Sequence, residues 1–434
     1  MATTAAALSA GLWAAGLWIA ASGAGLAQEI PYTAVAAPPA GESDCPGGLC
    51  QAEGLSGVFE ALAATEAGQR TRPVHILQIG DSHTAGDRIT GKLRADLQAR
   101  FGAAGRGVLP PGPPYDNYAP YQVRMAAAGW VAESPTLQPS AGTPSTRVGL
   151  AGMRTTGGEG ALIGFELDPG AEASVVGVCG RARGPGAGLS VEAGGMARGL
   201  DFNGTTPDQE VCRELALPGP TASVRLVPLE RGVVMDSVML SGGRPGAMVS
   251  SLGVIGATLR DLASRDEAIA AAELAMWRPS LIVLAFGTNE GFDDALHGRA
   301  YEALLREQIA RMRRLAPAAS LMLLGAPDAL RSGVAGGCSA DGQRAPPPSL
   351  AVVRDVQRRV AADMGVAFWD WRGRMGGECS ADRLALRDDP FMRGDRVHFT
   401  NTGADWIGGV LSRDLLAAYD GWKAARVTPA GEPQ

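Results

Sequence analysis

Short apolar runs alternate with amphipathic segments over much of this 434-residue chain, and that rhythm limits its fold more than any other feature. Residues 74–79 form one run, which stops at Gly80 as a buried strand of a parallel sheet does. Further strand-like runs lie at residues 281–286, 321–324 and 366–371, and segments with helical spacing lie at 301–315, 352–364 and 402–419. This alternation predicts an α/β fold, a parallel sheet with helices on both faces.

One long stretch interrupts the rhythm. From about residue 110 to 235 the chain is rich in Gly, Pro, Ser and Thr and has no long helical period, which predicts an inserted antiparallel β-rich module. Residues 28–50, rich in Pro, Gly and Ala, are predicted to be a linker. The predicted segments are a signal peptide (1–27), the linker (28–50), the two parts of the α/β domain (51–112 and 236–423), the inserted module (113–235) and a flexible tail (424–434).

The N-terminus is an uncharged apolar stretch. The run from Ala5 ends in Gly25-Leu26-Ala27, a small-x-small pattern that predicts a secretory signal cut after Ala27. No Lys or Arg precedes the run, so an uncleaved membrane anchor is the alternative, because about 20 apolar residues can span a bilayer. We expect a periplasmic or secreted protein with no stable membrane span after cleavage.

Six cysteines agree with an oxidising compartment. Their nearest neighbours in sequence predict three disulfides, although six cysteines leave 15 connectivities open. None of the cysteines has the spacing of metal ligands, and no metal is expected. The predicted pairs are Cys45 with Cys50, Cys179 with Cys212, and Cys338 with Cys379.

The charge balance disfavours a nucleic-acid partner. Lys and Arg total 39 against 45 for Asp and Glu, which gives a net charge of -6 and leaves no basic field for a polyanion.

Four short polar blocks follow predicted strands or precede the last helix. A Ser hydroxyl needs a base to take its proton, and the base needs a third group to fix its tautomer. Ser82 is therefore the candidate nucleophile, His398 the base and Asp395 its orienting acid, three residues before it. The blocks are Gly80-Asp81-Ser82-His83, Gly253-Val254-Ile255-Gly256, Gly287-Thr288-Asn289 and Asp395-Arg396-Val397-His398.

Each block alone is common as an ordinary turn or cap, and only their conjunction, in a chain with four histidines, points to chemistry. His83 directly follows the candidate nucleophile and is predicted to be structural or to contact substrate. Other chemistries fit less well. Residues 86–92 resemble a phosphate-binding loop but end without the Ser or Thr that binds magnesium, and neither Gly-x-Ser-x-Gly nor His-Glu-x-x-His occurs.

The four blocks, in this order, resemble those of the SGNH (GDSL-type) hydrolase family. The resemblance implies a flavodoxin-like three-layer domain and a serine esterase that needs no cofactor. It also implies an oxyanion hole made by the backbone N–H groups of Ser82 and Gly256 and the side-chain amide of Asn289. Gly253 is a possible substitute for Gly256 in the same pattern.

The long insertion makes the resemblance specific to one group of the family. Ser82 and Gly256 lie 174 positions apart, and a Gly-Asp-Ser-His block followed by Phe101-Gly102-Ala103-Ala104-Gly105-Arg106-Gly107 is similar to the peptidoglycan O-acetylesterases. The resemblance to that group implies that the insertion binds carbohydrate. It also implies that the protein removes O-acetyl groups from an acetylated envelope polysaccharide, with peptidoglycan as the favoured one. An O-acetyltransferase that uses the same residues and a non-catalytic glycan-binding envelope protein remain as alternatives. Tyr115, Tyr118, Tyr121 and Trp130 either stack on sugar rings or pack in a core.

Overall fold

A computed structural model describes residues 36–137, 147–229 and 232–427. The predicted signal peptide, residues 1–27, lies outside the described residues, as does most of the predicted tail. From Ala37 onward the chain forms one compact unit.

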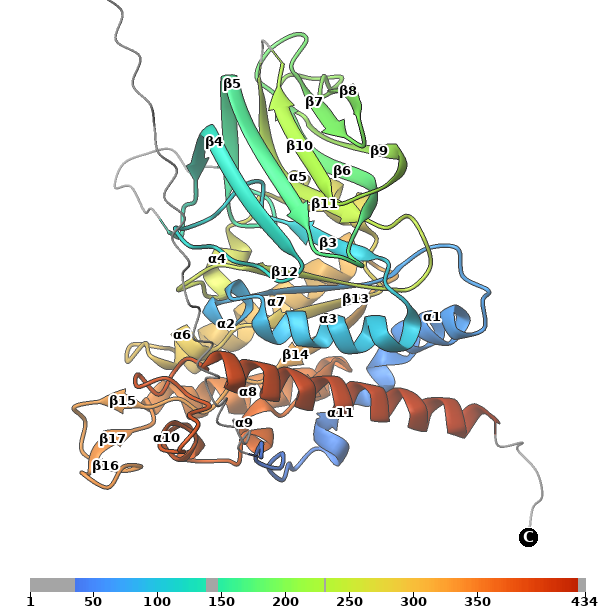
Figure 1. Cartoon of the computed structure of the whole chain (residues 1–434). Helices are drawn as coiled ribbons and strands as arrows, with labels where there is room; N and C mark the ends of the chain where they lie inside the picture. Colours follow the sequence, from blue (N-terminus) through green and yellow to red (C-terminus); the bar gives the residue numbers. More distant parts are fainter. Residues whose placement is uncertain (1–35, 138–146, 230–231, 428–434) are drawn as a thin grey trace, which may run out of the picture. The chain divides into compact units, whose positions relative to one another are not determined.

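A six-stranded sheet carries the predicted α/β domain (Figure 1). Its strand order is β1-β18-β14-β13-β2-β12, and every neighbouring pair is parallel except β1 with β18. The four apolar runs predicted as strands are confirmed. The strands are β1 Leu49–Cys50, β2 Val74–Gly80, β12 Ala247–Gly253, β13 Leu281–Ala285, β14 Ser320–Leu324 and β18 Ala367–Trp369.

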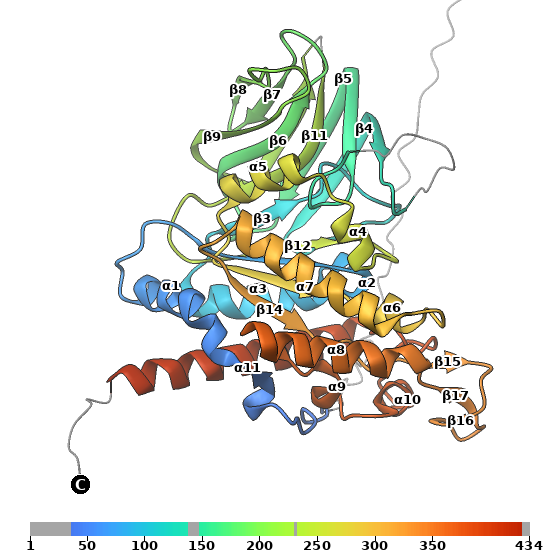
Figure 2. The ribbon, with the colours of Figure 1, turned by 180° about the vertical axis from the view of Figure 1, so that it is seen from behind.

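The two faces of this sheet bury alternate residues in separate cores. Val74 and Ile76 of β2 pack with α1 Ser56–Glu66, α3 Arg88–Phe101 and α11 Asn401–Val427, which lie in front of the sheet in Figure 1. Leu77 and Ile79 pack with α5 Glu267–Trp277, α7 Gly298–Leu315 and α8 Pro348–Met364, which are in front in Figure 2. Both faces are apolar, as in a parallel sheet covered on both sides.

The helices begin and end where local chemistry requires. In α8, Pro348 occupies the first helical position, where its missing N–H costs nothing, and Gly365 ends the helix in the left-handed conformation. In α7, Tyr301, Leu305 and Ile309 recur every fourth residue and are all buried. The remaining short helices are η1 Pro46–Gly48, η2 Ala52–Leu55, α2 Ser82–Ala85, α4 Leu259–Ala263, α6 Thr288–Gly291, α9 Trp371–Arg374 and α10 Ser380–Ala385.

The predicted insertion contains a nine-stranded antiparallel sheet. It extends beyond residues 113–235 at both ends, because β3 pairs with the far end of β11. Its strands are β3 Gly105–Leu109, β4 Val123–Glu133, β5 Arg154–Leu167, β6 Ala173–Ala182, β7 Gly188–Ala193, β8 Met196–Asp201, β9 Glu210–Thr221, β10 Ser223–Pro228 and β11 Val233–Ser241. A small third sheet consists of β15 Arg331–Ser332, β16 Gly336–Gly337 and β17 Gln343–Ala345.

A buried ion cluster joins the nine-stranded sheet to the α/β domain. Asp87, just before α3, lies 2.8 Å from an Arg94 nitrogen and 2.6 Å from an Arg106 nitrogen, and all three side chains are almost fully buried. Arg94 belongs to α3 and Arg106 to β3. A buried charge without a partner is costly, so this cluster fixes β3 against the α/β domain.

The described cysteines form the three predicted disulfides, Cys45–Cys50, Cys179–Cys212 and Cys338–Cys379. Cys50 lies in β1, so the last residues of the predicted linker belong to the sheet. A strand of two residues has no periodicity, which is why the sequence did not indicate it.

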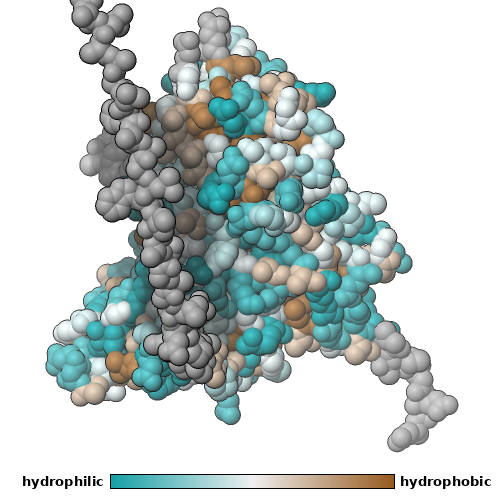
Figure 3. All heavy atoms as spheres, in the orientation of Figure 1, coloured by the Kyte–Doolittle hydropathy of each residue, from teal (hydrophilic) through white to brown (hydrophobic). Residues whose placement is uncertain are grey.

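The described residues expose few large apolar side chains. Figure 3 shows hydrophilic and hydrophobic residues interspersed over the visible face. The most exposed large apolar side chains, Val131, Ile255 and Leu386, come from separate elements. Among the described helices, none combines the length and apolar character needed to cross a membrane.

Candidate active site

Ser82 begins α2 directly after β2, at the carboxyl end of the sheet where open α/β folds place their chemistry. The Asp81 carboxylate caps this short helix by accepting a hydrogen bond from the His83 backbone N–H at 2.9 Å. The turn is tight because a Cβ on Gly80 would lie 2.4 Å from the Ala285 carbonyl oxygen. Ser82 is therefore held on a sharp strand-to-helix turn.

The loop before α11 brings the base candidate to this serine. His398 Nε2 lies 2.9 Å from the Ser82 hydroxyl oxygen. On its other side, His398 Nδ1 lies 2.8 Å from an Asp395 carboxylate oxygen. The structure thus places Ser82, His398 and Asp395 in one hydrogen-bonded chain, although the first two are 316 positions apart.

Asp395 is set up to remain ionised. Burial raises the pKa of its carboxyl, but hydrogen bonds from the backbone N–H groups of His398 and Val397, at 3.0 and 2.9 Å, and from the His398 ring lower it below its ordinary value. A carboxylate at Nδ1 keeps the proton on that nitrogen, so Nε2 faces the Ser82 hydroxyl as an acceptor. This is the tautomer that a general base needs.

The third block contacts the residue that directly follows the second block. The Asn289 side-chain amide, in α6, donates to the Ala257 carbonyl oxygen at 2.9 Å, which ties it to the turn that contains Gly256. Gly256 has a positive φ of 77° and open space around its Cβ position. Gly253 differs, because a Cβ there would lie 2.0 Å from the Ala85 backbone nitrogen. Gly253 thus allows β12 to approach α2, whereas Gly256 shapes the turn beside Asn289.

Two comparisons with known proteins bear on the family and the fold of the chain. The profile of the GDSL-like lipase/acylhydrolase family matches residues 236–406. The fold is similar to that of a solved peptidoglycan O-acetylesterase, with a TM-score of 0.72 and 25% identity over 86% of this chain and 99% of that chain. The chain carries a GDSL-type hydrolase domain.

Other comparisons of this GDSL-type hydrolase are weaker. An acetyl xylan esterase has a TM-score of 0.30 and 16% identity over 39% of this chain and 81% of its own. A family two carbohydrate esterase from Cellvibrio japonicus has a TM-score of 0.27 and 10% identity over 69% of this chain and 98% of its own. No curated protein sequence matches the chain. The family match and the O-acetylesterase fold together make the protein a serine esterase of the SGNH type.

A cavity of about 370 Å³ opens at Ser82. Ser82 and His398 line it together with Arg88, Tyr115 and Arg393. A second cavity of about 590 Å³ is lined by Asn289, Thr258 and Leu259, among others. The turn around Gly256 contributes residues to both, since Ile255 lines the first cavity. Of the predicted aromatic cluster, Tyr115 lies at the site, and Trp130 packs on Gly157 in the nine-stranded sheet.

His83 has a place in the hydrolase site that its sequence position did not reveal. Its Nδ1 lies 3.1 Å from Asp81 Oδ1 and its Nε2 lies 2.9 Å from the Val397 carbonyl oxygen. Burial lowers the pKa of His83, but the Asp81 carboxylate and the Val397 carbonyl outweigh it, so the pKa is raised overall. Both nitrogens have acceptors, so the protonated ring satisfies both at once.

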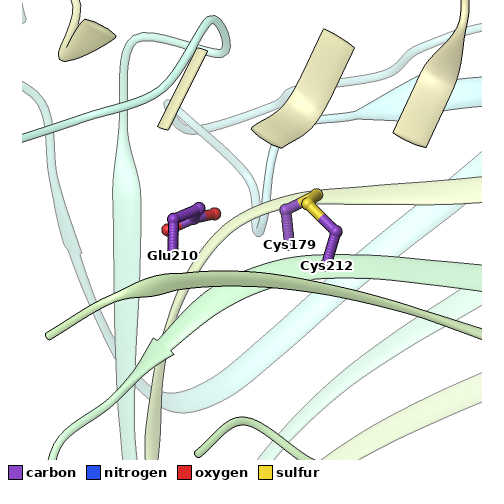
Figure 4. A group of neighbouring side chains, drawn as sticks. All are labelled: Cys179, Glu210 and Cys212. Carbon is purple, nitrogen blue, oxygen red and sulfur yellow. A yellow bond between two sulfur atoms is a disulfide. The ribbon is translucent and has the colours of Figure 1, made fainter. Parts of the chain in front are cut away.

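Among the residues that the structure describes, two groups of side chains have the composition of metal ligands. Figure 4 shows one of them, in which Cys179 and Cys212 lie beside Glu210. The other combines Cys338 and Cys379 with Glu378. In each group the two sulfur atoms are joined in a disulfide, so they do not offer the thiolates that bind a metal.

Proposed function

We propose that this esterase removes O-acetyl groups from a polysaccharide of the cell envelope through an acetyl-serine intermediate. The favoured polysaccharide is peptidoglycan. One observation carries the proposal: the continuous hydrogen-bonded chain from the Ser82 hydroxyl through His398 to Asp395, with distances of 2.9 and 2.8 Å. It supplies a nucleophile, a base and an orienting carboxylate in contact.

Each step follows from that arrangement. His398 Nε2 takes the Ser82 proton while Ser82 Oγ bonds to the acetyl carbonyl carbon, whose π electrons move onto the oxygen. The tetrahedral intermediate then expels the sugar oxygen, which receives the proton from the His398 imidazolium. A water molecule, deprotonated by His398, then attacks the acetyl-serine, and the second tetrahedral intermediate expels Ser82 Oγ, which takes the proton back from His398 as acetic acid leaves. The enzyme ends unchanged.

The negative oxygen of each intermediate needs hydrogen-bond donors. We assign them to the backbone N–H groups of Ser82 and Gly256 and to the Asn289 amide. The bond from Asn289 to the Ala257 carbonyl occupies one of its two amide N–H groups, so the second remains to donate. The same bond fixes the amide plane, and fixed donors lose little entropy when charge develops.

The substrate class rests on the similarity to the peptidoglycan O-acetylesterase, which extends over 86% of the chain. We also propose that the signal peptide, residues 1–27, exports the protein to the periplasm or beyond, in keeping with its three disulfides. In this scheme the α/β domain has the three-layer arrangement of the SGNH family, and the module at 113–235 binds glycan.

The test is acetate release by the purified protein from O-acetylated peptidoglycan, acetylated xylan and esters of longer acids. We expect fastest release from peptidoglycan, with no activity in Ser82→Ala and a loss of about a hundredfold in Asn289→Ala. The control is Ser56→Ala, since the Ser56 hydroxyl makes only a local bond to the Glu53 carbonyl at the start of α1. An active Ser82→Ala variant would refute the site, and preference for xylan would refute the substrate.

A further inference from the structure

Arg393 lines the cavity at Ser82 and His398, and its charge has no partner there. Within the described part of the chain, it forms no ion pair with Asp or Glu. Its Nε–H donates to the Phe399 carbonyl oxygen at 3.1 Å. A guanidinium has five N–H donors, so the four on the two terminal nitrogens remain uncommitted.

The backbone of Arg393 is fixed to the loop that carries the base. Its N–H donates to the His398 carbonyl oxygen at 2.7 Å, and its own carbonyl accepts from the Arg396 N–H at 3.0 Å. The neighbouring Met392 forms a β-bridge with Phe399. The Arg393 backbone is therefore fixed, and its exposed side chain is held through Nε where it lines the cavity.

The other cationic side chains of the cavity are already balanced, since the His83 ring lies 3.1 Å from an Asp81 carboxylate oxygen. Arg88 lies 3.3 Å from an Asp405 carboxylate oxygen, and its guanidinium carbon lies 4.7 Å from the centre of the Tyr121 ring. Neither Asp nor Glu is among the described residues that line the cavity. The uncompensated positive charge at the nucleophile therefore belongs to Arg393.

We infer that Arg393 binds a carboxylate of the substrate beside the ester that Ser82 attacks. This inference rests on the proposed function and narrows its substrate to an acidic acetylated glycan. A guanidinium matches a carboxylate by two parallel N–H···O bonds, and such charged bonds are stronger than neutral ones. The carboxylate can belong to a sugar acid of the glycan or to a peptide attached to it, and the two sources present the same group.

The experiment compares acetate release from matched substrates. The first pair is an O-acetylated, peptide-free glycan that contains sugar acids and the same glycan after amidation of its carboxyl groups. The second pair is the peptide-bearing glycan with its carboxyl groups free or amidated. For the wild type we expect kcat/KM to be about tenfold higher on the free acid of one pair, which identifies the source of the carboxylate.

The variant Arg393→Gln is expected to lose most of that tenfold preference. Arg88→Gln should lose less of it, because Asp405 already balances Arg88. The matched control is Arg413→Gln, an exposed arginine of α11 that does not line the cavity. A merely structural role of Arg393 would lower kcat/KM on both members of a pair and leave their ratio unchanged, and that result would overturn the inference. A wild type without preference in either pair would overturn it too.

Binding separates this inference from the proposed hydrolysis. Calorimetric titration of the Ser82→Ala protein with the same glycans should show tighter binding of the free acids, and Ser82→Ala/Arg393→Gln should not discriminate. This readout needs no turnover, so it still supports or refutes the carboxylate contact if the wild type releases no acetate.

Discussion

His83 Nε2 lies 2.9 Å from the Val397 carbonyl oxygen and so bridges the turn that carries Ser82 to the loop that carries His398. The centroids of the His83 and His398 rings lie 5.5 Å apart, and the angle between the ring planes is 30°. The hydrogen bond thus holds His83 to the residue that directly precedes His398.

Replacing His83 by Leu should lower kcat for a small acetyl ester by about tenfold and leave KM nearly unchanged, because small displacements of a base cost rate more than binding. His83→Gln keeps a donor for the Val397 carbonyl and should recover part of the rate. Steady-state kinetics and thermal unfolding of both variants check this. Equal kcat in His83→Leu and wild type would contradict the positioning role.

The two glycines of the second block should respond differently to alanine. Gly253→Ala places a Cβ 2.0 Å from the Ala85 nitrogen, so the turn that carries Ser82 must move. We expect a loss of about 1–3 kcal/mol in the free energy of unfolding together with reduced activity. Gly256→Ala meets no neighbour and carries only the strain of its positive φ, about 1 kcal/mol. Urea unfolding and esterase assays of both variants test this, and a Gly253→Ala protein as stable as Gly256→Ala would be inconsistent with the contact.

Asp87→Asn should be among the most destabilising polar substitutions in the chain. Asp87 also accepts hydrogen bonds from Thr90 and the Tyr121 backbone N–H, at 2.7 and 2.9 Å. Its φ is 49°, which Asn tolerates, so the change removes charge without altering the backbone. Two buried arginines lose their counter-ion, and we expect a loss of about 3–5 kcal/mol in urea unfolding. Asp294→Asn, which breaks an exposed pair with Arg331, is the control and should change little.

Glu273 should make the protein less stable as the pH rises. It is buried in α5, where desolvation raises its pKa to about 8, although the Leu150 N–H and the charge of Arg265 oppose the rise. Between the ordinary pKa and the raised one, the folded state holds a proton that the unfolded state releases. The contribution of Glu273 to the free energy of unfolding is therefore fully present below about pH 4.5. It falls by about 1.4 kcal/mol per pH unit up to about pH 8.

Glu273→Gln removes this titration. The free energy of unfolding of the variant, measured in urea between about pH 5 and pH 8, should rise relative to the wild type as the pH increases. The two pH profiles would run parallel if the Glu273 carboxyl were ionised in the folded protein.

Much of the fold was predictable because its signals are local. The run at residues 74–79 is buried on both faces and stops at a glycine, and each disulfide joins two cysteines that follow one another along the sequence. The start of the antiparallel sheet was not predictable. Arg106 lies fully buried inside β3, and a charged residue there hides the strand until Asp87 is known to face it.

The candidate site, like the fold, could be predicted only in part from the sequence. The residues Ser82, Asp395 and His398 could be chosen from their motifs, and the structure brings them together. The bridge from His83 to Val397 could not be foreseen, because it depends on two loops that are 314 positions apart and on a backbone carbonyl, which has no signature in a sequence.

The pairing of β3 with β11 means that the chain leaves the hydrolase domain and returns to it through adjacent strands. A chimera that exchanges the module for that of a relative has a natural seam there, since both cut points are neighbours. The Asp87 cluster determines how such a graft must be made: a donor module has to bring its own counterpart of Arg106, or the Asp87 carboxylate keeps only one of its two arginine partners, Arg94, at the junction.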